Sequence, residues 1–168
     1  MLEMMRSGEG KLSPTHFHNS VHNAASGYAS IATRNCSPST TLTGGDELVA
    51  AAFLEAFCCL DMADGDVVLV LADESLRPPF DGGGRSESLA VAFCLSTRPD
   101  GAAAVLSGLR RDDVPPLKHH EHFGSLYVSA ALPLLERIVR RRPGSVALEF
   151  EREGTRSITC VDLALVGS

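Results

Sequence analysis

The sequence predicts an α/β layered domain with the order helix, strand, buried helix, buried strand, strands, helix and strands. Three observations support this fold class. Residues 46–62 are apolar nearly all round, which is typical of a helix buried on all sides. Residues 67–71 form a continuous apolar run, as in a central strand covered on both faces. Further strand and helix patterns follow to the end of the chain, and such elements pack in layers around one core.

The composition is that of an ordinary globular protein. The 168 residues suit one domain with one core, and 44% of them are hydrophobic and 21% charged. The formal net charge of −6 repels polyphosphate, so nucleic acid is a poor candidate partner. No stretch approaches the ~20 consecutive apolar residues of a membrane span, and the N-terminus lacks a signal peptide's apolar segment. We therefore expect a cytoplasmic protein.

The first third of the chain predicts two helices and an edge strand. Residues 1–10 have apolar side chains at helical spacing and end in glycines, as in the last turns of a helix. A second helix begins at Asn19 or Ser20, either of which suits an N-cap, and extends to Ile31. Residues 37–43 are polar and β-branched with a proline near the start, which indicates an edge strand before the glycine turn into residues 46–62.

The remaining elements follow from turn residues and periodicity. Residues 77–85 are rich in glycine and proline and predict a loop. Residues 88–96 and 102–109 read as two strands, with a hairpin turn at 98–101 as the simplest connection.

An amphipathic helix is expected over residues 123–142, with Pro133 as a kink or break. Its basic end complements the helix dipole, and two strands over 145–150 and 157–166 close the domain. The basic residues at this end are Arg137, Arg140, Arg141 and Arg142.

Cysteine and histidine side chains were considered for catalysis and metal binding. Five cysteines form an odd set without CxxC spacing, four of them in apolar surroundings, so we expect reduced and mostly buried thiols. Cys36 precedes the predicted strand and has no helix N-terminus beside it to activate a thiolate. The cysteines are Cys36, Cys58, Cys59, Cys94 and Cys160.

The six histidines fall into two groups. His16, His18 and His22 lack an obvious carboxylate partner for a metal. His119, His120 and His122 are interpreted as a solvated surface patch. The glycine run at 82–84 lacks the Lys and Ser/Thr of a phosphate-binding loop. No metal, nucleotide or other cofactor is expected.

Three stretches carry a resemblance to a known family. They are residues 20–31 (SVHNAASGYASI), 38–56 (PSTTLTGGDELVAAAFLEA) and 65–74 (GDVVLVLADE). With this spacing, residues 14–74 resemble the β-ketoacyl synthase N-terminal domain, in particular the short ketosynthase-like or chain-length-factor-like proteins of aryl polyene clusters. The resemblance implies half of a thiolase-like layered fold with a mixed sheet and a buried central helix. A single domain over residues 1–168, without the family's first strands, is expected.

The resemblance places Asp46 at the position of the family's nucleophilic cysteine. That cysteine stands on a turn at the N-terminus of the buried helix, where the helix dipole and backbone amides favour a thiolate. A carboxylate suits a helix N-terminus and stabilises it by about 0.3–1 kcal/mol, but it cannot exchange thioesters. The family's second half, which supplies two decarboxylating histidines, is also expected to be missing. No catalytic activity is therefore expected.

The resemblance implies a heterodimer with a full-length ketosynthase in polyketide or fatty-acid-type biosynthesis, joined through the strand at 37–43. An acyl carrier protein is a further candidate partner. The alternative is an enzyme that transfers or hydrolyses acyl groups through a cysteine or the Asp46 turn. The interface candidates are Ser39, Thr41, Thr43, His22, Asn23 and Tyr28.

Overall fold

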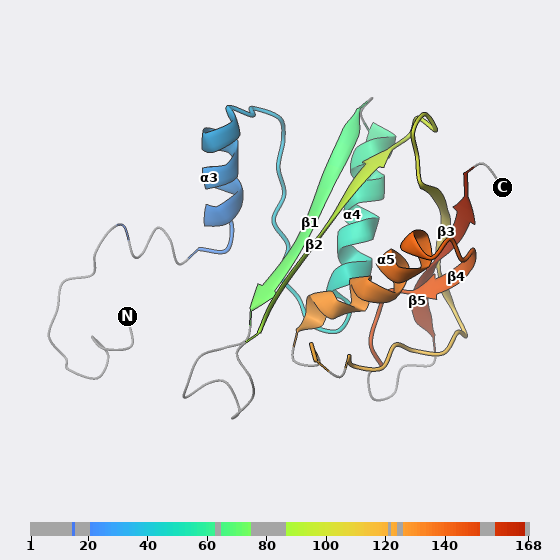
Figure 1. The fold of residues 1–168 in the computed structure, drawn as a ribbon. Helices are drawn as coiled ribbons and strands as arrows, with labels where there is room; N and C mark the ends of the chain where they lie inside the picture. Colours follow the sequence, from blue (N-terminus) through green and yellow to red (C-terminus); the bar gives the residue numbers. More distant parts are fainter. Residues whose placement is uncertain are drawn as a thin grey trace, which may run out of the picture. The chain divides into compact units, whose positions relative to one another are not determined.

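The computed structural model describes Thr15 and residues 21–62, 65–74, 87–120, 122–123, 126–151 and 157–166. The chain divides into two compact units, Met1–Thr43 and Gly44–Ser168, each of which is described by itself. Its mixture of helices and two small sheets fits the predicted α/β class (Figure 1). The predicted turns at 1–10, His16, His18 and the loop at 77–85 lie outside the described residues. Within those residues, no helix has the length and hydropathy needed to cross a membrane.

The predicted helix of the Met1–Thr43 unit is confirmed as α3, Ala24–Thr33. It begins after Asn23, whose side chain makes no cap hydrogen bond, and both predicted caps fall outside the described part of the chain. The helix ends at Arg34 in the left-handed conformation, with φ of 54°, and the next N–H donates to the Ser30 carbonyl at 2.9 Å. No residue of α3 is buried.

The predicted edge strand at residues 37–43 is wrong, because this segment is irregular. The Ser37 N–H donates to Oδ1 of Asn35 at 2.9 Å, and the Thr41 hydroxyl is hydrogen-bonded to the Ser26 hydroxyl at 3.0 Å. An extended segment becomes a strand only when a neighbour pairs with its backbone. Among the described strands, none pairs with this one.

In the Gly44–Ser168 unit, the long helix α4 packs on a two-stranded antiparallel sheet. Helix α4 is Leu48–Met62, and the sheet pairs β1, Asp66–Glu74, with β2, Ser88–Ser96. Figure 1 shows the two strands as a long, twisted ribbon beside α4. Alternate residues face the core, and Phe93 of β2 packs against Phe53 of α4 with ring centroids 5.3 Å apart. The predicted helix and apolar strand are both confirmed.

The expectation that these two elements are buried on all sides is wrong. On β1, Val68 and Val70 are 68% and 61% exposed, and the facing Ala92 and Cys94 of β2 are exposed as well. Helix α4 buries one face only, and its Leu54 is 56% exposed. A side chain is buried only where a second layer covers it. The described layers of the Gly44–Ser168 unit cover one side of each element.

The predicted hairpin between β2 and the next strand is also wrong. Strand β3, Ala104–Asp112, pairs with β5, Ile158–Leu165, which in turn pairs with β4, Gly144–Ala147. The chain does turn between the two strands, where the Ala102 N–H donates to the Pro99 carbonyl at 3.1 Å. A hairpin does not form there, because β3 pairs with β5 of the second sheet while β2 pairs with β1 over its whole length.

The expected mixed sheet is not found among the described strands, because all their pairings are antiparallel. A parallel arrangement occurs only as an isolated bridge between Leu117 and Phe150 within that part of the chain. Antiparallel pairing needs only short connections, whereas parallel neighbours need a long crossover.

The helix expected at 123–142 forms in two parts. A 3₁₀ helix, η1, covers Tyr127–Ala131, and α5 follows at Leu132–Val139. Pro133 lies in the first turn of α5, where its missing N–H costs no helical hydrogen bond, so the predicted break is confirmed. Element η1 contacts both β1 and β2 as well as α4, and α5 contacts β4.

The basic run closes the C-terminal end of α5, as predicted. Arg137 donates to the Pro143 carbonyl and Arg141 to the Val166 carbonyl, both at 3.1 Å. Arg140 forms an ion pair with Glu136 at 3.2 Å. Cations at this end satisfy carbonyl groups and complement the negative end of the helix dipole.

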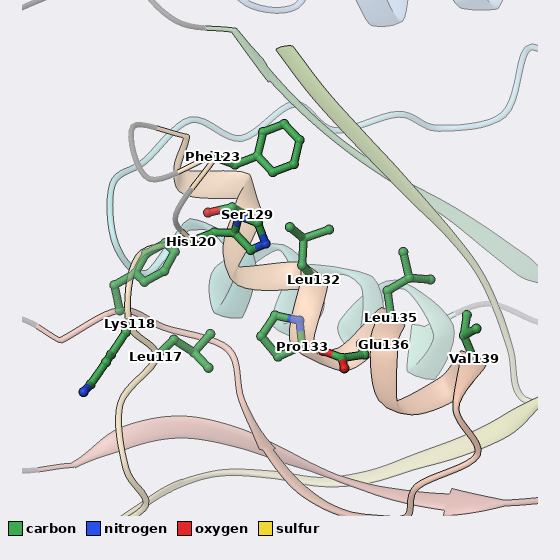
Figure 2. Close-up of a pocket in the computed structure, with 11 residues that line it drawn as sticks. Leu117, Lys118, His120, Phe123, Ser129, Leu132, Pro133, Leu135, Glu136 and Val139 are labelled. Carbon is green, nitrogen blue, oxygen red and sulfur yellow. The ribbon is translucent and has the colours of Figure 1, made fainter. Parts of the chain in front are cut away.

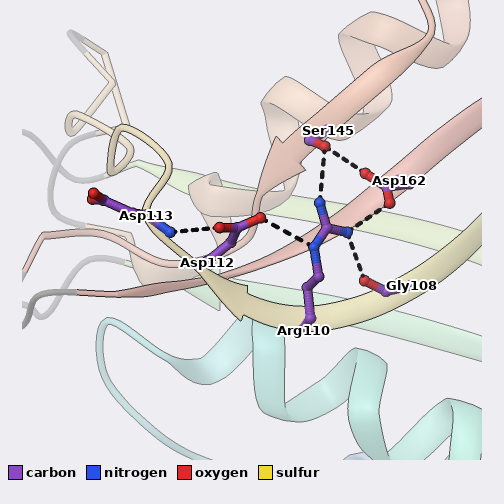
Figure 3. Close-up of polar contacts among 6 residues, drawn as sticks. All are labelled: Gly108, Arg110, Asp112, Asp113, Ser145 and Asp162. Atoms are coloured by element: carbon purple, nitrogen blue, oxygen red, sulfur yellow. Dashed lines mark hydrogen bonds and ion pairs between the residues drawn. The ribbon is translucent and has the colours of Figure 1, made fainter.

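A polar network joins the three strands of the second sheet (Figure 3). Arg110 donates to Asp162 at 2.6 Å, to Asp112 at 3.1 Å and to the Gly108 carbonyl at 3.0 Å. Asp162 also accepts a hydrogen bond from Ser145. Gly108 has φ of +62°, and a Cβ atom there would lie 3.0 Å from the Asp162 carboxylate, so the network needs a glycine at this position.

The Asp162 network predicts a loss of stability in acid. The Ser145 hydrogen bond, followed by that of Arg110, lowers the pKa of Asp162 from its ordinary value of 3.8. Because the pKa of Asp162 is lower in the folded than in the unfolded protein, ionised Asp162 stabilises the fold. This stabilisation is complete above the ordinary pKa and is lost as the pH falls through the pKa of the folded protein. Asp162→Asn should lower the melting temperature at pH 7 and flatten its decline between about pH 5 and 2. Circular dichroism melts test this, with exposed Asp100→Asn as the control; equal acid sensitivity in wild type and Asp162→Asn would contradict it.

The expectation of mostly buried thiols is wrong for four of the five cysteines. Cys36, Cys58, Cys59 and Cys94 are exposed, and only Cys160 is buried. The apolar neighbours of Cys58, Cys59 and Cys94 in sequence did not predict burial, because these thiols lie on the uncovered sides of α4 and β2. Burial raises the pKa of the Cys160 thiol, which keeps it protonated and unreactive.

We therefore predict that a disulfide reagent such as DTNB titrates four thiols of the native protein rapidly. The fifth, Cys160, should react only after denaturation, since it is buried on the central strand of the second sheet and its thiolate is disfavoured. The Cys160→Ser variant should retain all four fast thiols and lose the slow one. Fewer than four fast thiols in a monodisperse native sample would contradict the exposed faces of α4 and β2.

Candidate functional site

The candidate site is the turn that starts α4. It consists of residues 44–47, and the Leu48 N–H donates to the Gly45 carbonyl at 3.0 Å. The Ala51 N–H donates to the Glu47 carbonyl at 2.9 Å, which is the first regular helical bond of α4. Asp46 stands in the middle of the turn and is half-buried. Neither Gly44 nor Gly45 before it has a positive φ, so the turn does not require the conformational freedom of glycine.

Two neighbouring segments hold this turn in place. The Phe150 N–H donates to the main-chain carbonyl of Asp46 at 3.2 Å. On the other side, a Cβ atom on Gly45 would lie 3.9 Å from Cε1 of the Tyr127 ring, and the Tyr127 N–H donates to the Asp73 carboxylate at 3.1 Å. The structure thus brings together the Asp46 turn, the end of β1 and the start of η1.

The arrangement offers a carboxylate but no nucleophile suited to acyl transfer. The Asp46 carboxylate makes no hydrogen bond to any other described residue, so it does not cap α4 through its side chain. The turn contains neither cysteine nor histidine. A helix N-terminus favours an anion, but thioester exchange needs a thiolate or another activated nucleophile at that point.

The other candidate nucleophiles are the thiols of Cys36 and Cys160. Cys36 is exposed in the Met1–Thr43 unit, and no hydrogen bond to its thiol is found among the described residues. Cys160 is buried, with a raised pKa, in the middle of the second sheet. A positive neighbour makes a thiol reactive by lowering its pKa, but at Cys160 burial raises the pKa by more than the nearby Arg110 lowers it.

The second histidine group is exposed, as predicted, but its rings pack on aromatic side chains. His119 stacks on Phe150 with ring centroids 4.2 Å apart, and His120 lies 5.4 Å from Phe123. Nδ1 of His120 accepts the His122 N–H at 3.1 Å. Across the part of the chain that the structure describes, no three His, Cys, Asp or Glu side chains gather as a metal site would require.

All six interface candidates lie in the Met1–Thr43 unit. His22 and Asn23 directly precede α3, and Tyr28 on α3 is 50% exposed. Ser39 and Thr43 are exposed on either side of Thr41, whose hydroxyl is bonded to Ser26. The candidates are therefore accessible within their own unit, with Thr41 already anchored to α3.

Two features were missed by the sequence analysis. The first is a cleft of about 450 Å³ between α5 and residues 117–120 and Phe123, where Ser129 is among the lining residues (Figure 2). The second is Glu149, a carboxylate only 1% exposed, which accepts the Thr159 N–H at 3.3 Å and lies 3.9 Å from Arg111. The apolar i, i+3, i+7 spacing in α5 was a signal for the cleft wall, whereas no local pattern signalled the buried carboxylate.

Comparison with known proteins identifies one family. A family model described as the beta-ketoacyl synthase, N-terminal domain, matches residues 1–126 of the 168. The match includes α3, the Asp46 turn, α4 and the first three strands. No curated protein and no solved structure matches the chain significantly.

The geometry of the turn predicts which residues maintain it. Asp46→Ala should change the free energy of unfolding by less than about 0.5 kcal/mol, because only the Asp46 main chain is bonded. Phe150→Ala should cost about 3–5 kcal/mol, since its buried ring packs in the core. Urea denaturation measures both. A cost above about 1 kcal/mol for Asp46→Ala would instead indicate a carboxylate cap.

Proposed function

The chain belongs to the β-ketoacyl synthase N-terminal domain family, and from this we propose that it is a non-catalytic ketosynthase-like subunit. It pairs with an active β-ketoacyl synthase in polyketide or fatty-acid-type biosynthesis. Family membership supports the biosynthetic role, and the proposal adds the chain-length-factor-like task and the aryl polyene setting. The proposal places the protein in the cytoplasm, with an acyl carrier protein as a further candidate partner.

The observation that carries this proposal is the turn at the start of α4. In a condensing subunit this turn bears the nucleophilic thiol, and here it bears Asp46. The turn is tied to Phe150 through its backbone alone, so the geometry tolerates a change of side chain. A carboxylate at that point leaves a helix N-terminus without a group that can form a thioester.

The exposed apolar faces of α4 and β1 support a subunit that packs against further protein layers. Leu54 and Cys58 on α4 and Val68 and Val70 on β1 are exposed. Exposed apolar area of this kind marks an interaction surface. In half of a thiolase-like fold, the fold that the proposal assigns to this chain, the central helix has layers on both sides, which agrees with the apolar character of α4 all round.

Residues 37–43 are proposed as the contact with the partner ketosynthase. Within the described residues, no backbone hydrogen bond is found for residues 38–43, so the segment offers free donors and acceptors to a pairing strand. Ser39 and Thr43 of this segment are exposed, and His22 and Asn23 before α3 and Tyr28 on α3 add polar and aromatic side chains. A stable complex of this type buries more than about 1,000 Å².

Thr41→Pro should abolish the heterodimer. Proline removes the backbone N–H of residue 41, which pairing requires, and it restricts φ. Because it also removes the hydrogen bond to Ser26, Thr41→Val is the matched control that loses only this side-chain bond. Ser26→Ala is a second control, which also loses the hydrogen bond from the Ser26 hydroxyl to the Asn23 carbonyl. Co-expression with the ketosynthase from the same gene neighbourhood, followed by size-exclusion chromatography at micromolar concentration, measures the complex.

We expect co-elution for the wild type and both controls, and separate elution for Thr41→Pro. Separate elution of the wild type would contradict the heterodimer. Co-elution of Thr41→Pro with the ketosynthase would be consistent with the heterodimer but would contradict strand pairing at residues 37–43. A circular dichroism melt of Thr41→Pro shows whether the variant still folds.

The alternative, an acyl-transferring or acyl-hydrolysing enzyme, is tested by chemistry. The purified protein, incubated with acyl and malonyl carrier proteins, should show no covalent adduct by intact mass and no release of acid, since the turn at the start of α4 has no thiol and burial disfavours the Cys160 thiolate. Because four exposed thiols can react non-specifically, a variant with all four changed to serine is the control. An adduct that survives in this variant, or one that depends on a single cysteine, would favour the enzyme.

A further inference from the structure

The cleft of about 450 Å³ lies within the volume range of small-molecule sites. One wall is a face of α5, where Leu132, Leu135 and Val139 recur at the spacing of one helical face. Leu117 and Phe150 line it from the segments that meet at the isolated parallel bridge. Figure 2 shows the α5 side chains in a row that leads toward Ser129 and His120. The cleft is therefore largely apolar along α5 and polar at its η1 end.

The polar end contains a hydroxyl that has no partner. Ser129 lines the cleft and is 2% exposed, and its Oγ makes no hydrogen bond to any atom of the described residues. A buried hydroxyl without a partner is costly, because folding removes its water and returns nothing. Such a group at the end of an apolar cleft points to a ligand that supplies the missing hydrogen bond.

His120 provides a second donor to the same cleft. Its Nδ1 accepts the His122 N–H at 3.1 Å, so this nitrogen carries no hydrogen. The ring hydrogen is therefore on Nε2, which becomes a donor. His120 and Ser129 both line the cleft, and each has a hydrogen to offer.

The charges around the cleft favour a neutral ligand. Glu136 also lines the cleft and forms an ion pair with Arg140 at 3.2 Å. The Arg140 charge is therefore already paired and does not attract a second anion. Lys118 lines the cleft as well, but Figure 2 shows its amine extending away from the other labelled side chains. A carboxylate ligand would meet the Glu136 charge without a cation that faces it.

We infer that this cleft binds a neutral, mainly apolar molecule with one carbonyl oxygen, such as a ketone, ester or amide. The apolar part lies along Leu132, Leu135 and Val139, and the carbonyl oxygen accepts hydrogen bonds from Ser129 and His120. A carbonyl oxygen has two lone pairs and so accepts both. The site is separate from the Asp46 turn and does not depend on the proposed subunit function.

Three probes of similar size separate the contributions of the apolar ring, the carbonyl group and a negative charge to binding. Acetophenone has an apolar ring and a carbonyl group, ethylbenzene replaces the carbonyl by a methylene, and benzoate carries a negative charge. Titration of the full-length protein with each, followed through ¹H–¹⁵N chemical shifts, should give the tightest binding for acetophenone. We expect it to exceed ethylbenzene by about fivefold or more, as one net hydrogen bond provides, and benzoate to bind most weakly.

Ser129→Ala distinguishes a ligand-binding hydroxyl from a structural one. It should reduce the affinity for acetophenone to about that for ethylbenzene and leave ethylbenzene binding unchanged. The melting temperature of the free protein should stay the same or rise, because the variant removes an unsatisfied buried group. Ser107→Ala, an exposed serine of β3 outside the cleft, is the matched control and should change neither.

Several outcomes would overturn the inference. They are equal affinities for acetophenone and ethylbenzene, tighter binding of benzoate, or no shifts at residues of the cleft with any probe at millimolar concentration. A fall in melting temperature for Ser129→Ala would show that the hydroxyl has a structural partner. Loss of the heterodimer would have no bearing on these results, since residues 37–43 take no part in the cleft.

Discussion

The backbone of residues 148–150 connects the elements of the Gly44–Ser168 unit. The Leu148 N–H donates to the Thr159 carbonyl at 2.9 Å, the Glu149 carbonyl accepts the Leu117 N–H at 3.2 Å, and the Phe150 N–H donates to the Asp46 carbonyl at 3.2 Å. All three residues from 148 to 150 are at most 1% exposed. Buried backbone groups need hydrogen-bond partners. Through these bonds the short segment connects the second sheet at Thr159, the cleft wall at Leu117 and the start of α4 at Asp46.

The Asp46 turn and the cleft both depend on Phe150 but use different parts of it. Its N–H holds the turn, and its ring lines the cleft and stacks with His119. Because the turn is held through the Asp46 carbonyl, the side chain at residue 46 is free to vary without loss of the fold. On the proposal that Asp46 stands at the nucleophile position of the family, the thiol can be lost while the helix that presented it is kept.

The apolar pattern and the observed burial of α4 and β1 differ in an informative way. Both elements are apolar on faces that the described unit leaves exposed, as at Leu54 and Val70. A helix that buries one face normally has polar residues on the other, and a helix that is apolar all round is normally buried on all sides. The excess of apolar surface agrees with the proposal that this chain works within a larger assembly, in which further layers cover these faces.

The sequence by itself determined the local elements: α4, β1, β2, β5 and the break at Pro133 all follow from periodicity and proline geometry within a few residues. It also located Asp46 at the start of a helix, through the spacing of the glycine turn. Only the tertiary structure decided that β2 pairs with β1 and that, among the residues it describes, residues 37–43 pair with no strand and the Ser129 hydroxyl has no hydrogen-bond partner. Helix and turn preferences act between neighbours in the chain, whereas strand pairing, burial and hydrogen-bond satisfaction depend on residues far apart in sequence, whose meeting no local pattern encodes.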